Sequence, residues 1–323
     1  MSTRQKLSVI LLGVTLIWAF GCKGEEEPEL PVKDGYVTVE EGIKLYYRTV
    51  GDGPESIIIP AGFFLEKEFE PLANKDRTLI FYDMRSRGQS DKVTDAARIG
   101  MNFEISDLEA LRQHFEKEKV SLIGWSYLGA MVILYAHEYQ DHVKRVIQVG
   151  PLPPTKDLYL SAATTPIDNE SQARLDKMRK EGMDKTDPEG FTRAYWEAYF
   201  KIIFYDPANI ASFGSEYYKF PNEMPDNVFF QFGGILGSIE EWDWRELAKG
   251  IKVPVLTIHG DHDTIPMEGA REWAASLPNA RLLAVTKAGH LPFVERPEVF
   301  YPAVESFLNG EWPEKAVDVG ETQ

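Results

Sequence analysis

Three stretches of the chain contain side chains that together could carry out nucleophilic catalysis. Ser126 lies in LIGWSYLGAM, residues 122–131, after an apolar run and two residues beyond Gly124. The stretch IHGDHDTIP covers residues 258–266, and His290 lies in KAGHLPFVERP. A serine hydroxyl becomes an effective nucleophile when a histidine takes its proton and a carboxylate orients that histidine. Ser126 alone could equally be a serine at a helix start, so its role depends on the other two stretches.

Each of the three stretches follows a segment with the apolar pattern of a buried strand. The segments are Val120–Gly124, Val253–Ile258 and Ala280–Val285. Open α/β sheets bind ligands beyond the carboxyl ends of their strands, so the residues of these loops are expected to meet. A sharp strand-to-helix turn at Ser126 would hold that residue in a strained backbone conformation and expose its hydroxyl.

The acidic stretch offers more than one interpretation. Asp261 and Asp263 could each accept a hydrogen bond from an imidazole, and their positions alone leave the choice open. His259 and His262 make the same loop a candidate metal cluster, but all four residues crowd one loop and no distant ligand is evident. We therefore predict no metal and no cofactor. Among the six histidines, His290 is the one on a loop beyond a late strand with no other evident role.

The order of the segments predicts one α/β domain with an insertion. Residues 36–49 have the pattern of a hairpin, and strand-like and helix-like segments then alternate up to residue 149, as in a parallel sheet with helical crossovers. Residues 155–245 are polar and then strongly aromatic, and the alternation resumes at Val253. The predicted divisions are a signal peptide (1–21), an acidic linker (22–34), a core (35–154 and 246–310), a helical cap (155–245) and a polar tail (311–323).

Over about residues 36–310 the sequence resembles the α/β-hydrolase fold family. Serine, acid and histidine follow one another in that family's chain order. YDMRSRGQS, residues 82–90, is similar to the family's Asp-x-Arg-Gly-x-Gly-x-Ser loop, and Gly289-His290 with Glu295 and Pro297 matches its histidine loop. The resemblance implies a mostly parallel central sheet flanked by helices, with a helical cap inserted after the sixth core strand.

The resemblance also assigns roles within the site. The family's acid stands third after a glycine, here Gly260, which selects Asp263 as the partner of His290. The oxyanion of the reaction would be bound by the backbone N–H groups of Tyr127 and Phe63. Two positions depart from the family pattern: Ala61 stands where a histidine is usual, and Leu128 stands where glycine is usual, so we expect a slightly shifted helix after Ser126.

The cap predicts an apolar or aromatic substrate group. Of the 30 residues from Phe191 to Phe220, 11 are aromatic. Most of them are expected to form the cap's own core, and some to face the pocket. Tyr195-Trp196-Glu197 resembles the Trp-Glu of proline iminopeptidase caps, whose glutamate binds the substrate's amino group, although Glu197 could also be a solvated helix residue. The candidate substrate-binding residues are Phe64, Trp125, Trp196 and Glu197.

Three functions remain open at the level of the sequence. The first is a serine hydrolase that forms an acyl-enzyme on a small ester or related acyl compound. The second is an aminopeptidase of the proline iminopeptidase type, although that subfamily's His-Gly-Gly-Pro-Gly loop and Gly-Gly-Ser-Trp-Gly elbow are absent. The third, from another class, is an inactive binding module with the hydrolase fold, which the presence of all three candidate residues disfavours. A small molecule or short peptide is the expected substrate.

The first residues of the chain predict export and a lipid anchor. Arg4 and Lys6 precede a 14-residue apolar segment, Leu7–Phe20, which is too short for a membrane span. Cys22, the single cysteine of the chain, follows at a site that resembles a bacterial lipoprotein signal-peptidase site. The alternative is a plain signal peptide with a chance cysteine. The net charge of -16 disfavours a nucleic-acid partner, and nothing in the sequence indicates the oligomeric state.

Replacement of Cys22 tests the lipid anchor. Cys22→Ser removes the thiol that would carry the lipid, so we expect the variant to leave the membrane fraction of a bacterial host while the unaltered chain stays there. Immunoblots of membrane and soluble fractions measure the distribution, with Ser8→Ala, inside the apolar segment, as the control. A Cys22→Ser protein that stays in the membrane fraction would contradict the prediction.

Overall fold

An eight-stranded sheet forms the centre of the protein. The computed structural model describes residues 30–162 and 166–320 of the 323-residue chain. The strand order is β1-β2-β4-β3-β5-β6-β7-β8, with β1, β2 and β4 paired antiparallel and the remaining neighbours parallel. The strands are β1 Val32–Thr38, β2 Lys44–Val50, β3 Glu55–Pro60, β4 Arg77–Tyr82, β5 Val120–Trp125, β6 Val143–Val149, β7 Val255–Gly260 and β8 Ala280–Val285.

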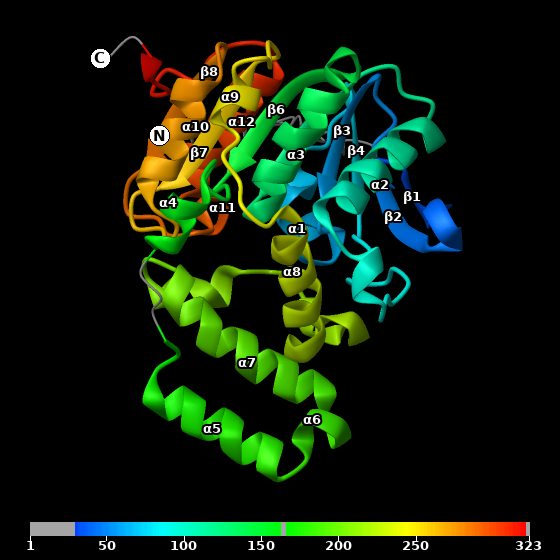
Figure 1. Cartoon of the computed structure of the whole chain (residues 1–323), viewed down its shortest axis with the longest axis vertical. Helices are drawn as coiled ribbons and strands as arrows, with labels where there is room; N and C mark the ends of the chain where they lie inside the picture. The colour runs from blue at the N-terminus through cyan, green and yellow to red at the C-terminus, as the bar shows by residue number, and fades with distance from the viewer. Residues whose placement is uncertain (1–29, 163–165, 321–323) are drawn as a thin grey trace, which may run out of the picture.

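Helices cover both faces of the sheet. In Figure 1, α2, α3 and α10 lie in front of the strands, and α1 and α12 lie behind them. The two rear helices pack together through Phe69 and Phe300, whose ring centroids are 5.7 Å apart. Covered on both faces, β3, β5 and β7 consist almost entirely of buried residues. The core helices are α1 Gly62–Phe69, α2 Met101–His114, α3 Tyr127–Glu138, α10 Met267–Ser276, α11 Pro292–Glu295 and α12 Pro297–Leu308.

A helical cap is inserted between β6 and β7. It lies beyond the carboxyl ends of the parallel strands and is seen below the core in Figure 1. The chain enters and leaves the cap side by side: Thr155 and Asp243 form an antiparallel bridge, and the Trp244 N–H donates to Pro154 O at 2.8 Å. The helices between entry and exit are α4 Lys156–Leu160, α5 Asn169–Lys180, α6 Met183–Thr186, α7 Pro188–Ile203 and α8 Pro225–Ile239, and the short α9 Arg245–Ala248 follows the exit and packs on α10 of the core.

The sequence patterns located most elements to within a few residues. The strand expected at 280–285 has those bounds, and the strands expected at 120–124 and 253–258 run over 120–125 and 255–260. The helix after Ser126 starts directly at Tyr127. Residues 311–320, expected to be a solvated tail, contact the sheet instead: Val317 and Leu282 of β8 exchange two backbone hydrogen bonds of 2.9 Å. No helix within 30–162 and 166–320 is long and apolar enough to cross a bilayer.

The ends of β7 and β8 are fixed by a close backbone contact. A Cβ atom added to Gly260, the last residue of β7, would lie 2.1 Å from Gly289 O and 2.3 Å from Ala288 O. Only a residue without a side chain allows the acidic loop after β7 to pass so near the histidine loop after β8. Gly260 therefore sets the distance between the loops that carry Asp263 and His290.

Gly260→Ala should destabilise the fold. The added methyl group meets backbone oxygens that cannot rotate away, so we expect the free energy of unfolding to fall by about 2–3 kcal/mol. Urea unfolding followed by circular dichroism measures the change. Gly250→Ala is the matched control, because its added Cβ lies 3.4 Å from the nearest carbonyl oxygen. Equal stabilities of the two variants would contradict the expectation.

Candidate active site

Ser126 occupies a strained turn between β5 and α3. Its φ of 60° and ψ of -132° lie in a region that residues with side chains rarely adopt. Backbone contacts hold the turn: the Ser126 N–H donates to Val149 O at 2.9 Å, and Leu152 N–H donates to Ser126 O at 3.1 Å. A Cβ atom on Gly124 would lie 2.3 Å from Leu128 O, so the glycine two residues before the serine is required for the close passage of the helix. The turn is intact despite Leu128.

Asp263 and His290 form a buried acid–imidazole pair. His290 Nδ1 lies 2.8 Å from Asp263 Oδ2, and the other carboxylate oxygen accepts a 2.9 Å hydrogen bond from the Ile265 N–H. Burial alone would raise the pKa of Asp263, but the neighbouring His290 and His259 rings and these hydrogen bonds bring it below its usual value. Asp263 is therefore ionised, and it fixes which ring nitrogen of His290 carries a proton.

The competing residues of the acidic stretch lie elsewhere. Asp261 contacts His262 Nδ1 at 2.6 Å and accepts the Lys287 N–H at 2.8 Å, on the surface. His259 is buried 3.8 Å from Asp263, with Nε2 against Ile265 O at 2.9 Å. Within the described parts of the chain, no group of three or more His, Cys, Asp and Glu side chains is arranged to hold a metal ion.

The cap and the core together position the His290 loop. The His290 N–H donates to the carbonyl of Ile203, the last residue of α7, at 2.8 Å. Trp125 Nε1 donates to His290 O at 2.9 Å, and its ring lies against the imidazole with centroids 4.9 Å apart. The Glu295 carboxylate accepts hydrogen bonds from the backbone N–H of Gly289 at 2.6 Å and from the backbone N–H of the cap residue Asp206 at 3.0 Å. The glutamate of the histidine loop is thus a structural anchor for both segments.

The two backbone donors expected for the oxyanion differ in this structure. Tyr127 N–H, the first of α3, has no acceptor among the described residues. Phe63 N–H instead donates to Asp83 Oδ1 at 2.7 Å, which differs from the expectation that it faces the pocket unpaired. Ala61 takes a left-handed conformation with φ of 63°, so α1 starts at once and turns this N–H toward Asp83. Burial raises the pKa of Asp83 to about 7.

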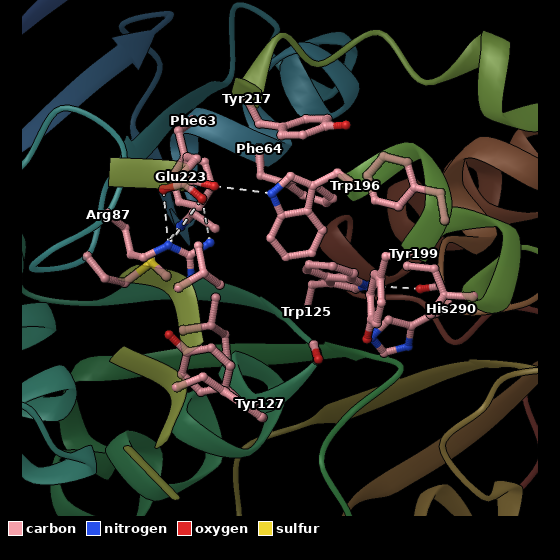
Figure 2. A pocket seen from close by; sticks show the side chains of 18 of the residues that line it. Phe63, Phe64, Arg87, Trp125, Tyr127, Trp196, Tyr199, Tyr217, Glu223 and His290 are labelled. Atoms are coloured by element: carbon pink, nitrogen blue, oxygen red, sulfur yellow. Dashed lines mark hydrogen bonds and ion pairs between the residues drawn. The ribbon is translucent and has the colours of Figure 1, made fainter. Parts of the chain in front are cut away.

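Ser126 and His290 open on one pocket between core and cap, of about 180 Å³ (Figure 2). An engineered cavity of about 150 Å³ holds benzene, so the space suits one small apolar group. Phe64 stacks on Trp125 with ring centroids 4.8 Å apart and closes one wall. The lining consists of Ala61, Phe63, Phe64, Met84, Arg87, Trp125, Ser126, Tyr127, Leu128, Trp196, Tyr199, Phe200, Ile203, Tyr217, Glu223, Val228, Phe229, Phe232 and His290.

The structure separates the sequence-derived pocket candidates. Phe64, Trp125 and Trp196 line the pocket, whereas Glu197 is exposed on α7 and is absent from the lining. Arg87 and Glu223, which were not among the sequence-derived candidates, also line the pocket, and they are its two lining residues of the Arg, Lys, Asp and Glu types. Arg87 stands inside the quoted Asp-x-Arg loop, so its position could have been noticed. Glu223 carries no local sequence signal.

Comparisons with known proteins agree with this architecture. Residues 59–297 match the alpha/beta hydrolase fold family. The chain is 26% identical to the proline iminopeptidase of Thermoplasma volcanium over 281 residues, covering 81% of this chain and 92% of that protein. It is 24% identical to the proline iminopeptidase of Saccharolobus solfataricus, covering 86% and 93%. The solved esterase of Exiguobacterium antarcticum superposes with a TM-score of 0.64 at 19% identity, covering 85% and 98%, which indicates a shared fold.

A buried acid lies behind Tyr127, between the core and the cap. Glu104 of α2 accepts a 3.2 Å hydrogen bond from Gln231 Nε2 of α8, and the same nitrogen lies 3.2 Å from the Tyr127 hydroxyl. Burial first, and then the nearby Asp107, raise the pKa of Glu104 to about 8, while Arg85 and Arg87 oppose the change. The carboxyl group is therefore protonated in the folded protein at neutral pH.

Stability should consequently fall as pH rises from about 4.5 to 8. In the unfolded chain Glu104 ionises near its ordinary pKa of 4.5, whereas the folded protein keeps the proton up to about pH 8. The free energy of unfolding should therefore fall by up to about 4 kcal/mol across this pH range. Glu104→Gln removes this contribution and should flatten the pH dependence measured by urea unfolding at pH 5, 6.5 and 8. Glu170→Gln, at an exposed site on α5, is the control. Parallel pH curves for Glu104→Gln and the unaltered protein would contradict the assignment.

Proposed function

Because the chain belongs to the alpha/beta hydrolase fold family, we propose that it is a serine hydrolase that acts on a small ester or related acyl compound. One observation carries the proposal. The strained Ser126 and the Asp263-oriented His290 line the same pocket, which supports their acting as nucleophile and base on an acyl group enclosed there. The rest of the pocket wall is mostly aromatic and aliphatic.

The proposed mechanism uses the groups in the order that their chemistry requires. His290 takes the proton of the Ser126 hydroxyl through Nε2 as the oxygen attacks the acyl carbon, and then gives it to the leaving alcohol. Asp263, ionised and hydrogen-bonded to Nδ1, stabilises the imidazolium that forms. Water then attacks the acyl-enzyme with His290 again as base, which releases the acid and restores Ser126.

The oxyanion that forms during attack needs preorganised donors. Tyr127 N–H supplies the first, since it directly follows the nucleophile and is unpaired among the described residues. Phe63 N–H can supply the second only after it leaves Asp83. Each such donor lowers the activation barrier of a serine hydrolase by roughly 2.7–4 kcal/mol.

An aminopeptidase is the second candidate, because the chain is similar to two proline iminopeptidases over most of its length. The charge distribution in the pocket disfavours it. A substrate amino group requires a free carboxylate, yet Glu197 is exposed outside the pocket and Glu223 is neutralised by Arg87. We further propose that the protein is exported and lipid-anchored through Cys22, which lies outside the described residues.

A side-by-side assay tests the proposal. The full-length chain should hydrolyse 4-nitrophenyl butanoate faster than proline 4-nitroanilide, and Ser126→Ala should lower ester turnover by a factor on the order of 10⁴ or more. Release of the nitrophenol or nitroaniline chromophore measures both rates. Ser306→Ala, on the distant helix α12, is the matched serine control and should keep the activity.

The outcomes separate the three candidate functions. Ser126-dependent cleavage of the anilide at a rate comparable to the ester would replace the esterase proposal with the aminopeptidase one. Absence of turnover on both compounds, with a folded protein by circular dichroism, would support an inactive binding module. Equal ester turnover in Ser126→Ala and the unaltered chain would overturn the assignment of the nucleophile.

A further inference from the structure

A buried ion pair occupies the side of the pocket away from the catalytic base. Figure 2 shows Arg87 and Glu223 together on one side, and Trp125 with His290 on the other. Arg87 belongs to the core loop after β4, and Glu223 to the cap segment Pro221–Glu223. Their side chains are almost inaccessible to solvent, with exposed fractions of 11% and 2%. Charges are rarely placed in an otherwise apolar pocket without a role there.

The carboxylate of this pair is fully used. Glu223 Oε1 accepts from Arg87 Nε at 3.0 Å and from the Gly88 N–H at 2.8 Å. Its Oε2 accepts from Arg87 Nη2 at 2.7 Å and from Nε at 3.2 Å. A carboxylate with four short contacts has no strong acceptor site left for a substrate ammonium group.

The guanidinium, in contrast, retains donors. Nη1 of Arg87 has no acceptor among the described residues, although this side chain lines the pocket. The ring of Phe63 lies 4.7 Å from the guanidinium carbon and holds its plane in place. The two N–H bonds of Nη1, on a cation whose side chain is 11% exposed, are therefore available to an acceptor that enters the pocket.

The charge of the pair decides which acceptor fits. Glu223 already neutralises Arg87, so the pair is neutral as a whole. A substrate carboxylate would bring an uncompensated negative charge into an apolar space close to Glu223, at a large desolvation cost. A carbonyl oxygen accepts from Nη1 without adding charge, and hydrogen bonds to charged donors are stronger than neutral ones.

From this geometry we propose that Arg87 is a specificity-determining residue that selects acyl groups with a second, uncharged carbonyl oxygen. This inference rests on the proposed function, because it places the scissile acyl carbon at Ser126 and the second carbonyl at Nη1. The substrate class is thus a keto-acyl or diester-type compound whose acyl part is small enough for a pocket of about 180 Å³. The same pair also joins cap to core, and the experiment separates this role from recognition.

Binding to a catalytically silent protein tests the inference without hydrolysis. In Ser126→Ala, titration with methyl 4-oxopentanoate and methyl pentanoate is followed by intrinsic tryptophan fluorescence, to which Trp125 and Trp196 of the pocket lining contribute. We expect the keto ester to bind at least about tenfold more tightly, although its greater polarity would make a purely apolar pocket prefer the plain ester. Methyl 5-oxohexanoate against methyl hexanoate covers a different spacing of the two carbonyls.

Arg87→Lys, in the same Ser126→Ala background, is the decisive variant. Lysine keeps the charge opposite Glu223 but loses the planar fork that provides Nη1. We expect the ratio of the two affinities to fall to about one. Where this variant does not fold, Arg87→Met with Glu223→Met replaces the whole pair by apolar side chains, a change that buried ion pairs often tolerate. The same drop in the ratio is expected there.

The outcomes are distinct from those of the ester assay. Equal or weaker binding of both keto esters overturns the inference, even where Ser126-dependent ester hydrolysis supports the proposed function. A ratio that survives Arg87→Lys also overturns it and leaves Arg87 as a contact between cap and core. Tighter binding of monomethyl succinate than of the keto esters would show that the pocket selects a carboxylate instead. If Ser126→Ala prefers the keto esters but the unaltered chain hydrolyses neither the keto esters nor 4-nitrophenyl butanoate, the result would support the binding preference of Arg87 and refute the hydrolase proposal.

Discussion

The contact between Asp263 and His290 is the constraint on which the rest of the site depends. These residues come from loops that follow adjacent parallel strands, and each strand must end at the same level for Nδ1 and Oδ2 to meet at 2.8 Å. Gly260 allows the loops to approach, and Gly150, whose added Cβ would lie 2.9 Å from the imidazole, leaves room for the ring. The cap completes the arrangement through the carbonyl of Ile203. The His290 loop is therefore held by the core and the insertion together.

Burial has different effects on the ionisable groups around this pocket. Asp263 stays charged because two imidazoles and a backbone N–H face it, whereas Glu104 and Asp83 lack a bound cation of their own and hold protons at higher pH. The desolvation cost of the buried Arg87 and Glu223 side chains is offset by their ion pair. The largely apolar pocket thus contains no unpaired ionised side chain of the Arg or Glu type among its lining residues. The N–H donors of Arg87 Nη1 and of the Tyr127 backbone have no acceptor there among the described residues.

The sequence predicted the parts of the site that depend on local patterns. Ser126, Asp263 and His290 follow apolar strands, and parallel strands bring such loops to one edge. Glu197 was a poor candidate for a reason visible in the sequence: Trp196, Tyr199, Phe200 and Ile203 repeat at helical spacing and line the pocket, so the residue after Trp196 faces away. The pairing of Phe63 N–H with Asp83 and of Arg87 with Glu223 depends on contacts between distant segments, which no local pattern specifies.

The paired entry and exit of the cap has a consequence for how such a protein can diversify. Thr155 and Asp243 are bridged, so the whole insertion is a loop whose two ends already touch, and no strand of the sheet crosses it. Recombination at these two points could replace the interval by one of another length without altering a single strand register. The exchange would carry one condition, because a new insertion must still present a backbone carbonyl to the His290 N–H where Ile203 now does. The cap side of the pocket could then change while Ser126, Asp263 and His290 keep their positions on the core.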